Sequence, residues 1–83
     1  MKFKDFSLSG VRGVVEGLGD TFYTNDVSGH TALRSMHRPL SGEEHTYRQM
    51  VGRYLSMRRR ELGLILTPRG KAGQGRLWEK SAS

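Results

Sequence analysis

The residues best suited to bind a ligand lie along one side of the segment 42–62. On a helical projection of about 100° per residue, the exposed face of this segment holds no acidic residue and collects Arg48, Gln49, Gly52, Arg53, Ser56, Arg59 and Arg60. Arginine and glutamine form paired hydrogen bonds with guanine and adenine, and arginine also binds phosphate. A helix C-terminus favours cations by itself, which accounts for about two of the three arginines at 58–60 but not for Arg48 or Arg53. The pattern therefore favours a polyanionic ligand.

A second group of basic residues follows in the stretch PRGKAGQGR, which contributes Arg69, Lys71 and Arg76 and no acidic side chain. Residues 1–40 carry five basic and four acidic residues, whereas residues 41–83 carry nine and four. The whole chain has a net charge of +6 and a pI of about 10.3. Because such an excess of positive charge attracts nucleic acid, we expect the binding surface to lie in the second half of the chain.

Other kinds of site find little support in the sequence. The chain has no cysteine, which excludes disulfide frameworks, thiolate zinc sites and a cysteine nucleophile. His30, His37 and His45 are seven and eight residues apart, so no two of them share the i, i+4 spacing of metal ligands on a helix. The glycines of GKAGQG lack the spacing of a phosphate-binding P-loop, and no serine lies in a GxSxG motif. We therefore expect no enzyme activity, no cofactor and no metal site.

The length and composition allow one small domain with a thin core, since 83 residues include 35% hydrophobic side chains. We expect this single domain to span residues 1–83 and to be ordered from about residue 7 to about residue 80. The sequence has no apolar run typical of a signal peptide and no stretch of about 18 apolar residues that could cross a membrane. These features predict a protein of the cytoplasm, including the nucleoid, without membrane contact.

The first forty residues predict two helices and a short strand. Apolar residues at helical spacing indicate a helix over 8–18, with Ser7 as its N-cap and Gly19 as its stop. Its glycines favour close helix packing over a nucleic-acid-binding GxxG loop. Residues 21–23 favour a strand, and Thr24 is a suitable N-cap for a second helix over about 25–35. Val27 falls nearly opposite the apolar side of that helix, and Pro39 prevents its continuation.

The second half predicts a long helix and a hairpin. Ser41 and Glu44 fit a capping box at the start of a helix over about 42–62, which Gly63 closes. Its apolar stripe consists of Tyr47, Met50, Val51, Tyr54, Leu55 and Leu62. Two strands then follow, over 64–67 and 76–80, separated by a Gly-rich loop that is too long for a tight turn and should project and move.

The predicted core combines the apolar faces of these elements. The stripe residues Met50, Val51, Tyr54, Leu55 and Leu62 are expected to pack on Leu8, Val11, Val15, Leu18 and Leu33, with Leu64, Leu66 and Leu77 added from the hairpin. Trp78 could stack on an unpaired base, but its place in a returning strand favours a core or hairpin position. Stability must come from this packing, because no disulfide is available.

The order of elements resembles the winged helix-turn-helix superfamily. The segment YRQMVGRYLSMRRRELGLILTPRGKAGQGRLWEK is similar to the last helix and wing of that superfamily, and FYTNDV is similar to its strand-to-second-helix entry. The resemblance covers about residues 8–80. The Gly-rich first helix and the long stretch SMHRPLSG between the second and third helices depart from the usual pattern. The resemblance implies an α+β winged-helix fold with three helices and a C-terminal hairpin wing.

The resemblance also implies a mode of binding to double-stranded DNA. The third helix, over about 42–62, would lie in the major groove and the wing, over about 67–76, on the backbone or the minor groove. The residues that would face bases are His45, Thr46, Arg48, Gln49 and Arg53, and those that would face phosphates are Arg59, Arg60, Arg69, Lys71 and Arg76. By analogy, the protein would regulate transcription or serve a virus, plasmid or other mobile element.

An alternative is an adaptor or inhibitor whose basic face binds an acidic protein partner or RNA, because winged helices also serve as interaction modules. No helix follows the wing to build a dimer. We therefore expect a monomer, or a weak homodimer formed through the N-terminal helix, and light scattering would distinguish the two.

Overall fold

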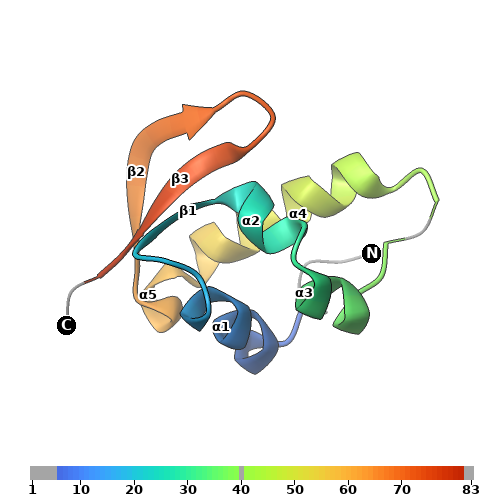
Figure 1. Ribbon diagram of the computed structural model, residues 1–83, viewed down its shortest axis with the longest axis horizontal. Helices are drawn as coiled ribbons and strands as arrows, with labels where there is room; N and C mark the ends of the chain where they lie inside the picture. Colours follow the sequence, from blue (N-terminus) through green and yellow to red (C-terminus); the bar gives the residue numbers. More distant parts are fainter. Residues whose placement is uncertain (1–5, 40, 82–83) are drawn as a thin grey trace.

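The chain forms an α+β fold in which short helices and one short strand precede a long helix and a C-terminal hairpin (Figure 1). The computed structural model describes residues 6–39 and 41–81. Over these residues the elements are, in order, α1 (Leu8–Glu16), β1 (Thr21–Tyr23), α2 (Thr24–Ser28), α3 (Thr31–Met36), α4 (Glu44–Met57), α5 (Arg59–Leu62), β2 (Leu64–Lys71) and β3 (Gly75–Lys80). The α+β class predicted from the sequence is confirmed. None of the described helices is long and apolar enough to cross a membrane.

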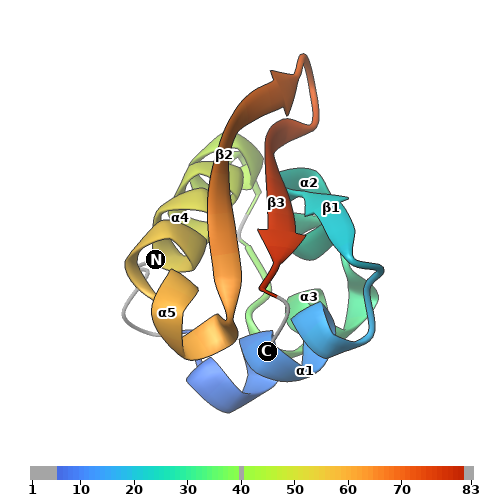
Figure 2. The same ribbon diagram turned by 90° about the vertical axis from the view of Figure 1, so that its left-hand side faces the viewer.

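The three strands form one antiparallel sheet in the order β1-β3-β2. The last strand therefore lies between the first strand and its own hairpin partner (Figure 2). Trp78 of β3 is opposite Phe22 of β1 and Leu66 of β2. Phe22 and Trp78 are both buried in the core, so this face of the sheet covers the helices. The pairing of β1 with β3 thus joins two segments that are far apart in the sequence.

The first helix begins as the sequence predicts and ends earlier. Ser7 is its N-cap, and the Ser7 hydroxyl accepts a hydrogen bond from the Gly10 N–H at 3.3 Å. The C-cap is Gly17 rather than Gly19. The interpretation of its glycines as packing residues is confirmed at Gly10, where a Cβ would lie only 2.7 Å from the sulfur of Met36 on α3, and is wrong at Gly13, where a Cβ would meet no atom within 4 Å.

The prediction of a single second helix over 25–35 is wrong, because two short helices, α2 and α3, meet at Gly29 and His30. His30 has an extended backbone, and its Nδ1 accepts a hydrogen bond from the Ala32 N–H at 3.1 Å, so it starts a new helix. The break changes the direction of the chain. Val27 and Leu33, which would lie on different sides of one continuous helix, are therefore both fully buried.

The capping box predicted for the long helix is also wrong. The N-cap is Glu43, without a side-chain cap, and Ser41 lies in a turn before it. Gly42 has a φ of +84°, which turns the chain so that Ser41 does not adjoin the helix. The Glu44 carboxylate is instead hydrogen-bonded to Arg34 of α3.

The predicted helix over 42–62 is interrupted near its end. Arg58 leaves helical geometry, with φ of −105° and ψ of 16°, and separates α4 from the single turn α5. Gly63 then adopts the left-handed conformation, at φ of 68°, and stops the helix as predicted. The basic residues of the C-terminal part therefore lie on a separate turn and do not continue the face of α4.

The hairpin is tighter than the sequence indicates. The strands continue through the predicted loop to Lys71 and from Gly75, which leaves a turn of residues 72–74. Gly73 and Gly75 close this turn with φ values of 81° and 86°, in the region that side chains rarely adopt. The register shifts between Leu66 and Gly70, and the strands pair again at Gly70 and Lys71. The two strands therefore continue past a stretch of low strand propensity.

The hairpin projects from the body as predicted (Figure 2), and the last residue of its turn is bonded to α2. The carbonyl of Gln74 accepts a hydrogen bond from the backbone N–H of Asn25 at 2.9 Å. A contact between the turn and α2 was not expected from a Gly-rich loop.

The core lies between the sheet and the helices. Its buried apolar members are Phe6, Val11, Val14, Val15, Phe22, Val27, Leu33, Tyr47, Met50, Val51, Tyr54, Leu55, Leu64 and Trp78, with Leu8, Leu18 and Leu62 packed at its edge. The predicted stripe of α4 is confirmed. The prediction for Leu66 is wrong, because its side chain is 43% exposed, and Leu77 is only half-buried. Trp78 is 1% exposed, which confirms the core position that the sequence favoured over base stacking.

Candidate functional site

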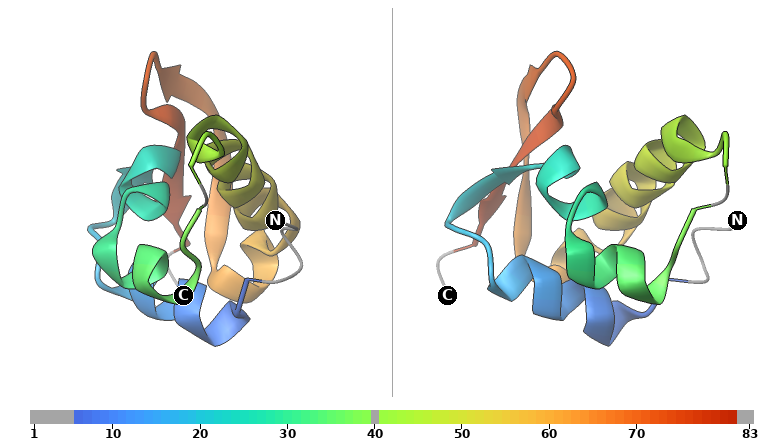
Figure 3. Two further views of the ribbon diagram at one scale, coloured as in Figure 1. Left: turned by 90° about the vertical axis from the view of Figure 1, so that its right-hand side faces the viewer. Right: turned by 45° about the vertical axis from the view of Figure 1, so that its right-hand side comes forward.

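A groove between α4 and the β2–β3 hairpin is the candidate site. Figure 3 shows α4 and the hairpin diverging as two arms, with α2 between them. The groove has a volume of about 560 Å³ and is lined by Thr24, Asn25, Ser28, His45, Arg48, Gln49, Gly52, Arg53, Ser56, Gly73, Gln74, Gly75, Arg76 and Trp78. No acidic side chain is among these residues. The groove thus brings together the two basic segments identified from the sequence. It also includes a third segment, α2, that the sequence did not indicate.

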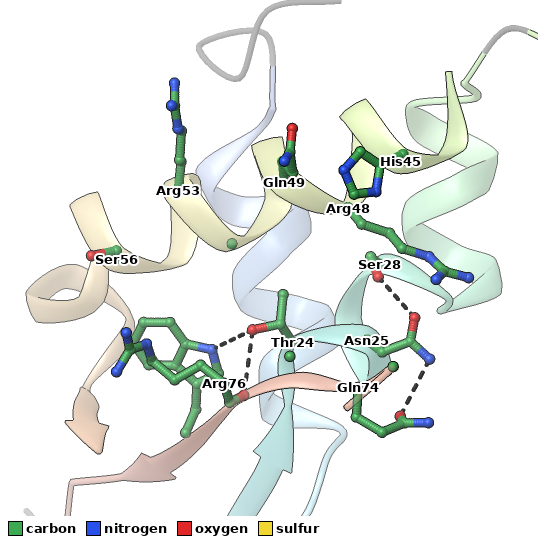
Figure 4. Close-up of a pocket in the computed structure, with 14 residues that line it drawn as sticks. Thr24, Asn25, Ser28, His45, Arg48, Gln49, Arg53, Ser56, Gln74 and Arg76 are labelled. Carbon is green, nitrogen blue, oxygen red and sulfur yellow. Dashed lines mark hydrogen bonds between the residues drawn. The ribbon is translucent and has the colours of Figure 1, made fainter. Parts of the chain in front are cut away.

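The α4 wall consists of the polar sector of an amphipathic helix. Tyr47, Val51 and Leu55 are buried on one side of α4. The opposite side, at three- and four-residue steps, presents His45, Arg48, Gln49, Gly52, Arg53 and Ser56 to the groove. In Figure 4, Arg48 extends from α4 toward α2, whereas Arg53 projects away from α2. The helix therefore offers one cation inside the groove and one at its outer side.

The hairpin wall consists of the turn and the start of β3. The guanidinium of Arg76 donates a hydrogen bond to the carbonyl of Thr67 on β2 at 2.7 Å. Gln74 and the two glycines beside it complete this wall. A Cβ at Gly73 would meet no atom within 4 Å, so the backbone of the turn is uncovered there, whereas a Cβ at Gly75 would lie 3.0 Å from the Thr24 Cβ.

The floor comes from the start of α2 and from β3. The hydroxyl of Thr24 accepts a hydrogen bond from the Trp78 Nε1–H at 2.9 Å and donates to the carbonyl of Arg76 at 3.4 Å. The Asn25 amide donates to the Gln74 side chain at 3.3 Å and accepts from the Ser28 hydroxyl at 3.3 Å (Figure 4). These bonds connect the floor to the hairpin wall.

The cations of the groove have no acidic partner among the described residues. The ion pairs found there are Arg34–Glu44, at 2.6 Å, and Arg58–Glu61, at 3.6 Å, and both lie outside the groove lining. Arg48 and Arg53 are exposed and form no ion pair within the described part of the chain. Their positive charge is therefore available to an anionic ligand.

Arg34 neutralises the acidic residue at the start of α4. Its guanidinium donates two hydrogen bonds to the Glu44 carboxylate, at 2.9 and 2.6 Å, and a third to the Ser28 carbonyl at 3.0 Å. The hydrogen bond to Arg34 lowers the pKa of Glu44, and the same bond raises the pKa of Arg34. The guanidinium also lies 5.3 Å from the centre of the Tyr47 ring. Glu44 is thus paired from outside the groove, which limits its repulsion of an anion.

The structure brings together half of the residues predicted from the sequence. Those that line the groove are His45, Arg48, Gln49, Arg53 and Arg76. Those outside the lining are Thr46, Arg59, Arg60, Arg69 and Lys71. Arg59 follows the break at Arg58, and its guanidinium donates a hydrogen bond to the Ser56 carbonyl at 2.9 Å. Arg69 and Lys71 are exposed on β2 and extend the basic surface of the hairpin.

Sequence reasoning missed the floor of the groove. Thr24 was predicted as an N-cap, but the N-cap is Tyr23, whose N–H donates to the Asp26 carboxylate at 2.8 Å. This bond satisfies the helix start and leaves the Thr24 hydroxyl for β3. The partners of Thr24 and Asn25 in the hairpin are 49 to 54 residues away in the sequence, so no local pattern could have indicated them.

The histidines have separate surroundings, and no three potential metal-ligating side chains come together among the described residues. His30 caps α3, whereas Nε2 of His37 accepts a hydrogen bond from the Ser7 N–H at 3.3 Å. Only His45 of the three lies in the groove.

Comparison of the chain with protein-family models, curated proteins and solved structures found no match. The residues and geometry of the groove are therefore the basis for assigning a function.

Proposed function

We propose that this protein binds double-stranded DNA through the groove between α4 and the hairpin. One observation carries the proposal: two basic segments that are separate in the sequence form the walls of one groove without an acidic side chain. Proteins that bind nucleic acid concentrate cations in this way, because phosphate neutralisation supplies much of the affinity. The binding surface also agrees with the charge excess in the second half of the chain.

The arrangement supports a winged-helix mode of binding. The elements follow the order that the resemblance implies, except that five helices replace three, because the second helix is divided into α2 and α3 and the third into α4 and α5. In this mode α4 enters the major groove and the hairpin acts as the wing. The 14 residues of α4 make a helix about 21 Å long, and a major groove about 12 Å wide admits such a helix.

The groove residues would have different roles in this mode. Arg48 and Gln49 carry the groups that pair with guanine and adenine, and His45 lies one turn before them. Arg53 points to the outer side of α4, where it can reach either a base edge or a phosphate (Figure 4). Arg69 and Lys71 on the hairpin would bind phosphates. A protein that reads base edges in this way would suit regulation of transcription, and it would act in the cytoplasm, where bacterial or mobile-element DNA is accessible.

A titration with three nucleic acids tests this function. Fluorescence anisotropy with labelled duplex DNA, single-stranded DNA and RNA at two salt concentrations should show the tightest binding to duplex, weakened by salt. Preference for RNA would contradict the proposal and favour the RNA alternative. Absence of binding to all three at low salt would favour an adaptor with an acidic protein partner.

A further inference from the structure

Thr24 occupies the point at which three elements meet. It is the first residue of α2, and its side chain is 9% exposed. Its hydroxyl is used twice toward β3, as acceptor for the Trp78 indole and as donor to the Arg76 carbonyl. A hydroxyl in this position forms both kinds of hydrogen bond that it can form, so it fixes β3 relative to α2.

The other side of Thr24 faces α4. A Cβ at Gly52 of α4 would lie 3.6 Å from the Thr24 methyl carbon, and a Cβ at Gly75 would lie 3.0 Å from the Thr24 Cβ. The absence of side chains at these two glycines therefore lets α4 and the hairpin approach the same threonine. Gly75 also has a φ of +86°, so a side chain there would be strained as well as crowded.

α2 bridges the two walls of the groove, which are otherwise connected through α5 and the shared core. α2 packs against both α4 and β3, whereas close backbone approaches between α4 and the hairpin strands are few. In Figure 4, Thr24 lies beneath α4 with its hydrogen bonds directed to β3. The Asn25–Gln74 bonds add a second link from α2 to the hairpin turn.

We propose that Thr24 is a positioning residue that sets the separation between α4 and the hairpin and thereby adapts the groove to the rigid backbone of duplex DNA. The second part of this statement rests on the proposed function. A groove of fixed width is preorganised for a stiff ligand, so little free energy is lost in ordering the hairpin on binding. A flexible single strand can adapt to a wider or more variable groove, and we expect it to depend less on Thr24.

The matched control is Thr67, the other buried threonine described, which is 7% exposed. Its hydroxyl donates to the Leu77 carbonyl at 2.6 Å and accepts from the Arg69 N–H at 3.3 Å. Both partners belong to the hairpin itself. Thr67→Val therefore removes a buried hydroxyl with two hydrogen bonds, as Thr24→Val does, but leaves the link between α2 and the hairpin intact.

The first experiment measures geometry without DNA. Because the chain has no cysteine, spin labels at Met57→Cys on α4 and Ala72→Cys in the hairpin turn would report one distance by electron spin resonance. Thr24→Val, which loses both hydrogen bonds to β3, should shift or broaden the distance distribution, whereas Thr67→Val should leave it unchanged. Thr24→Ser keeps both hydrogen bonds and loses only the methyl group next to Gly52, so its effect should be smaller than that of Thr24→Val. An unchanged distribution in Thr24→Val would overturn the proposal.

A measurement on the unmodified chain keeps the test decisive if Thr24→Val does not fold. The chain has one tryptophan, so its indole N–H gives a single resonance. We expect slow hydrogen exchange at this group because it is buried and bonded to Thr24. Rapid exchange would show that the bond does not hold the hairpin and would overturn the proposal.

The second experiment measures binding. The ratio of duplex to single-stranded DNA affinity should fall about tenfold in Thr24→Val, fall less in Thr24→Ser, which keeps the hydroxyl, and stay nearly constant in Thr67→Val. If the unmodified protein binds no DNA, the proposed function fails, while the distance measurement still decides the role of Thr24 in the groove. If the unmodified protein binds duplex and Thr24→Val changes the distance but not the ratio, the inferred adaptation to duplex is wrong.

Discussion

The two walls of the groove are held in place by different interactions. α4 is anchored by an apolar stripe, in which Leu55 is fully buried and Tyr47 is 1% exposed. The base of the hairpin is also anchored by burial, through Leu64 and Trp78, and by pairing with β1, but the part that lines the groove is held by hydrogen bonds with Thr24 and Asn25 of α2. Apolar burial has no preferred direction, whereas hydrogen bonds depend strongly on distance and angle. The difference indicates that burial supplies the stability of the site and that a few polar groups determine its shape.

The largest expected effect comes from removing the anchor of the α4 wall. Leu55→Ala should lower the free energy of unfolding by about 2–5 kcal/mol, because it leaves a cavity in a small core. Urea unfolding followed by circular dichroism measures this change. The control is Leu66→Ala, whose side chain is 43% exposed and whose effect should stay below about 1 kcal/mol. A loss below about 1 kcal/mol at Leu55 would mean that burial on α4 is not the main anchor.

The next prediction concerns the cations of the α4 wall. Arg48→Ala or Arg53→Ala should weaken binding to a preferred duplex by about 1–3 kcal/mol and reduce the difference between preferred and random duplexes. Anisotropy titrations with the two DNAs measure both quantities. Arg38→Ala is the control, since Arg38 is exposed and outside the groove lining. Equal losses of affinity for both DNAs would show that these arginines contact phosphates and do not read bases.

The hairpin wall should respond differently. Replacing Arg69 and Lys71 together by alanine should weaken binding almost equally for all duplexes, because phosphate contacts carry no sequence information. The slope of log affinity against log salt should become smaller by about 2. If neither the affinity nor the slope changes, the hairpin does not contact nucleic acid, and the adaptor alternative gains support.

A smaller effect is expected from the hydroxyl of Tyr47, which has no hydrogen-bond partner among the described residues. Burial raises the pKa of Tyr47, which shows that its surroundings favour the neutral hydroxyl. Tyr47→Phe keeps the ring beside Arg34 and removes the buried polar atom. The free energy of unfolding of the Tyr47→Phe variant should therefore be about 1 kcal/mol higher than that of the unmodified protein. A decrease of that size in urea unfolding would show that the hydroxyl stabilises the α4 wall.

The smallest expected effect is the acid dependence of the Arg34–Glu44 pair. Arg34 holds the pKa of Glu44 below its ordinary 4.5. The contribution of this pair to the stability of the fold is therefore fully present above pH 4.5 and is lost as the pH falls through the lowered pKa of Glu44. Glu44→Gln should therefore reduce the loss of stability between pH 5 and pH 3, measured by thermal unfolding. Glu79→Gln, at a glutamate without an ion pair among the described residues, is the control. An unchanged acid profile in Glu44→Gln would show that the pair does not stabilise the start of α4.

Much of the fold follows from patterns within a few residues. The Ser7 cap, the strand at 21–23, the buried stripe of α4 and the stop at Gly63 all occur where the sequence predicts them. Each is indicated by residue types and spacings within a few positions, although the strand at 21–23 forms only by pairing with β3. The basic face of α4, with its two arginines in the groove, was predictable for the same reason.

The tertiary structure decided how these parts are joined. The predicted second helix is interrupted at His30, and Glu44 pairs with Arg34 and does not form a capping box. The hairpin loop is limited to residues 72–74. The tertiary structure also directed the Thr24 hydroxyl to β3, across 52 and 54 residues of sequence. Helix periodicity and capping patterns carry no information about such distant partners. The sequence by itself therefore determined the charge and the faces of the elements, and the packing of distant segments determined that two of those faces enclose one groove.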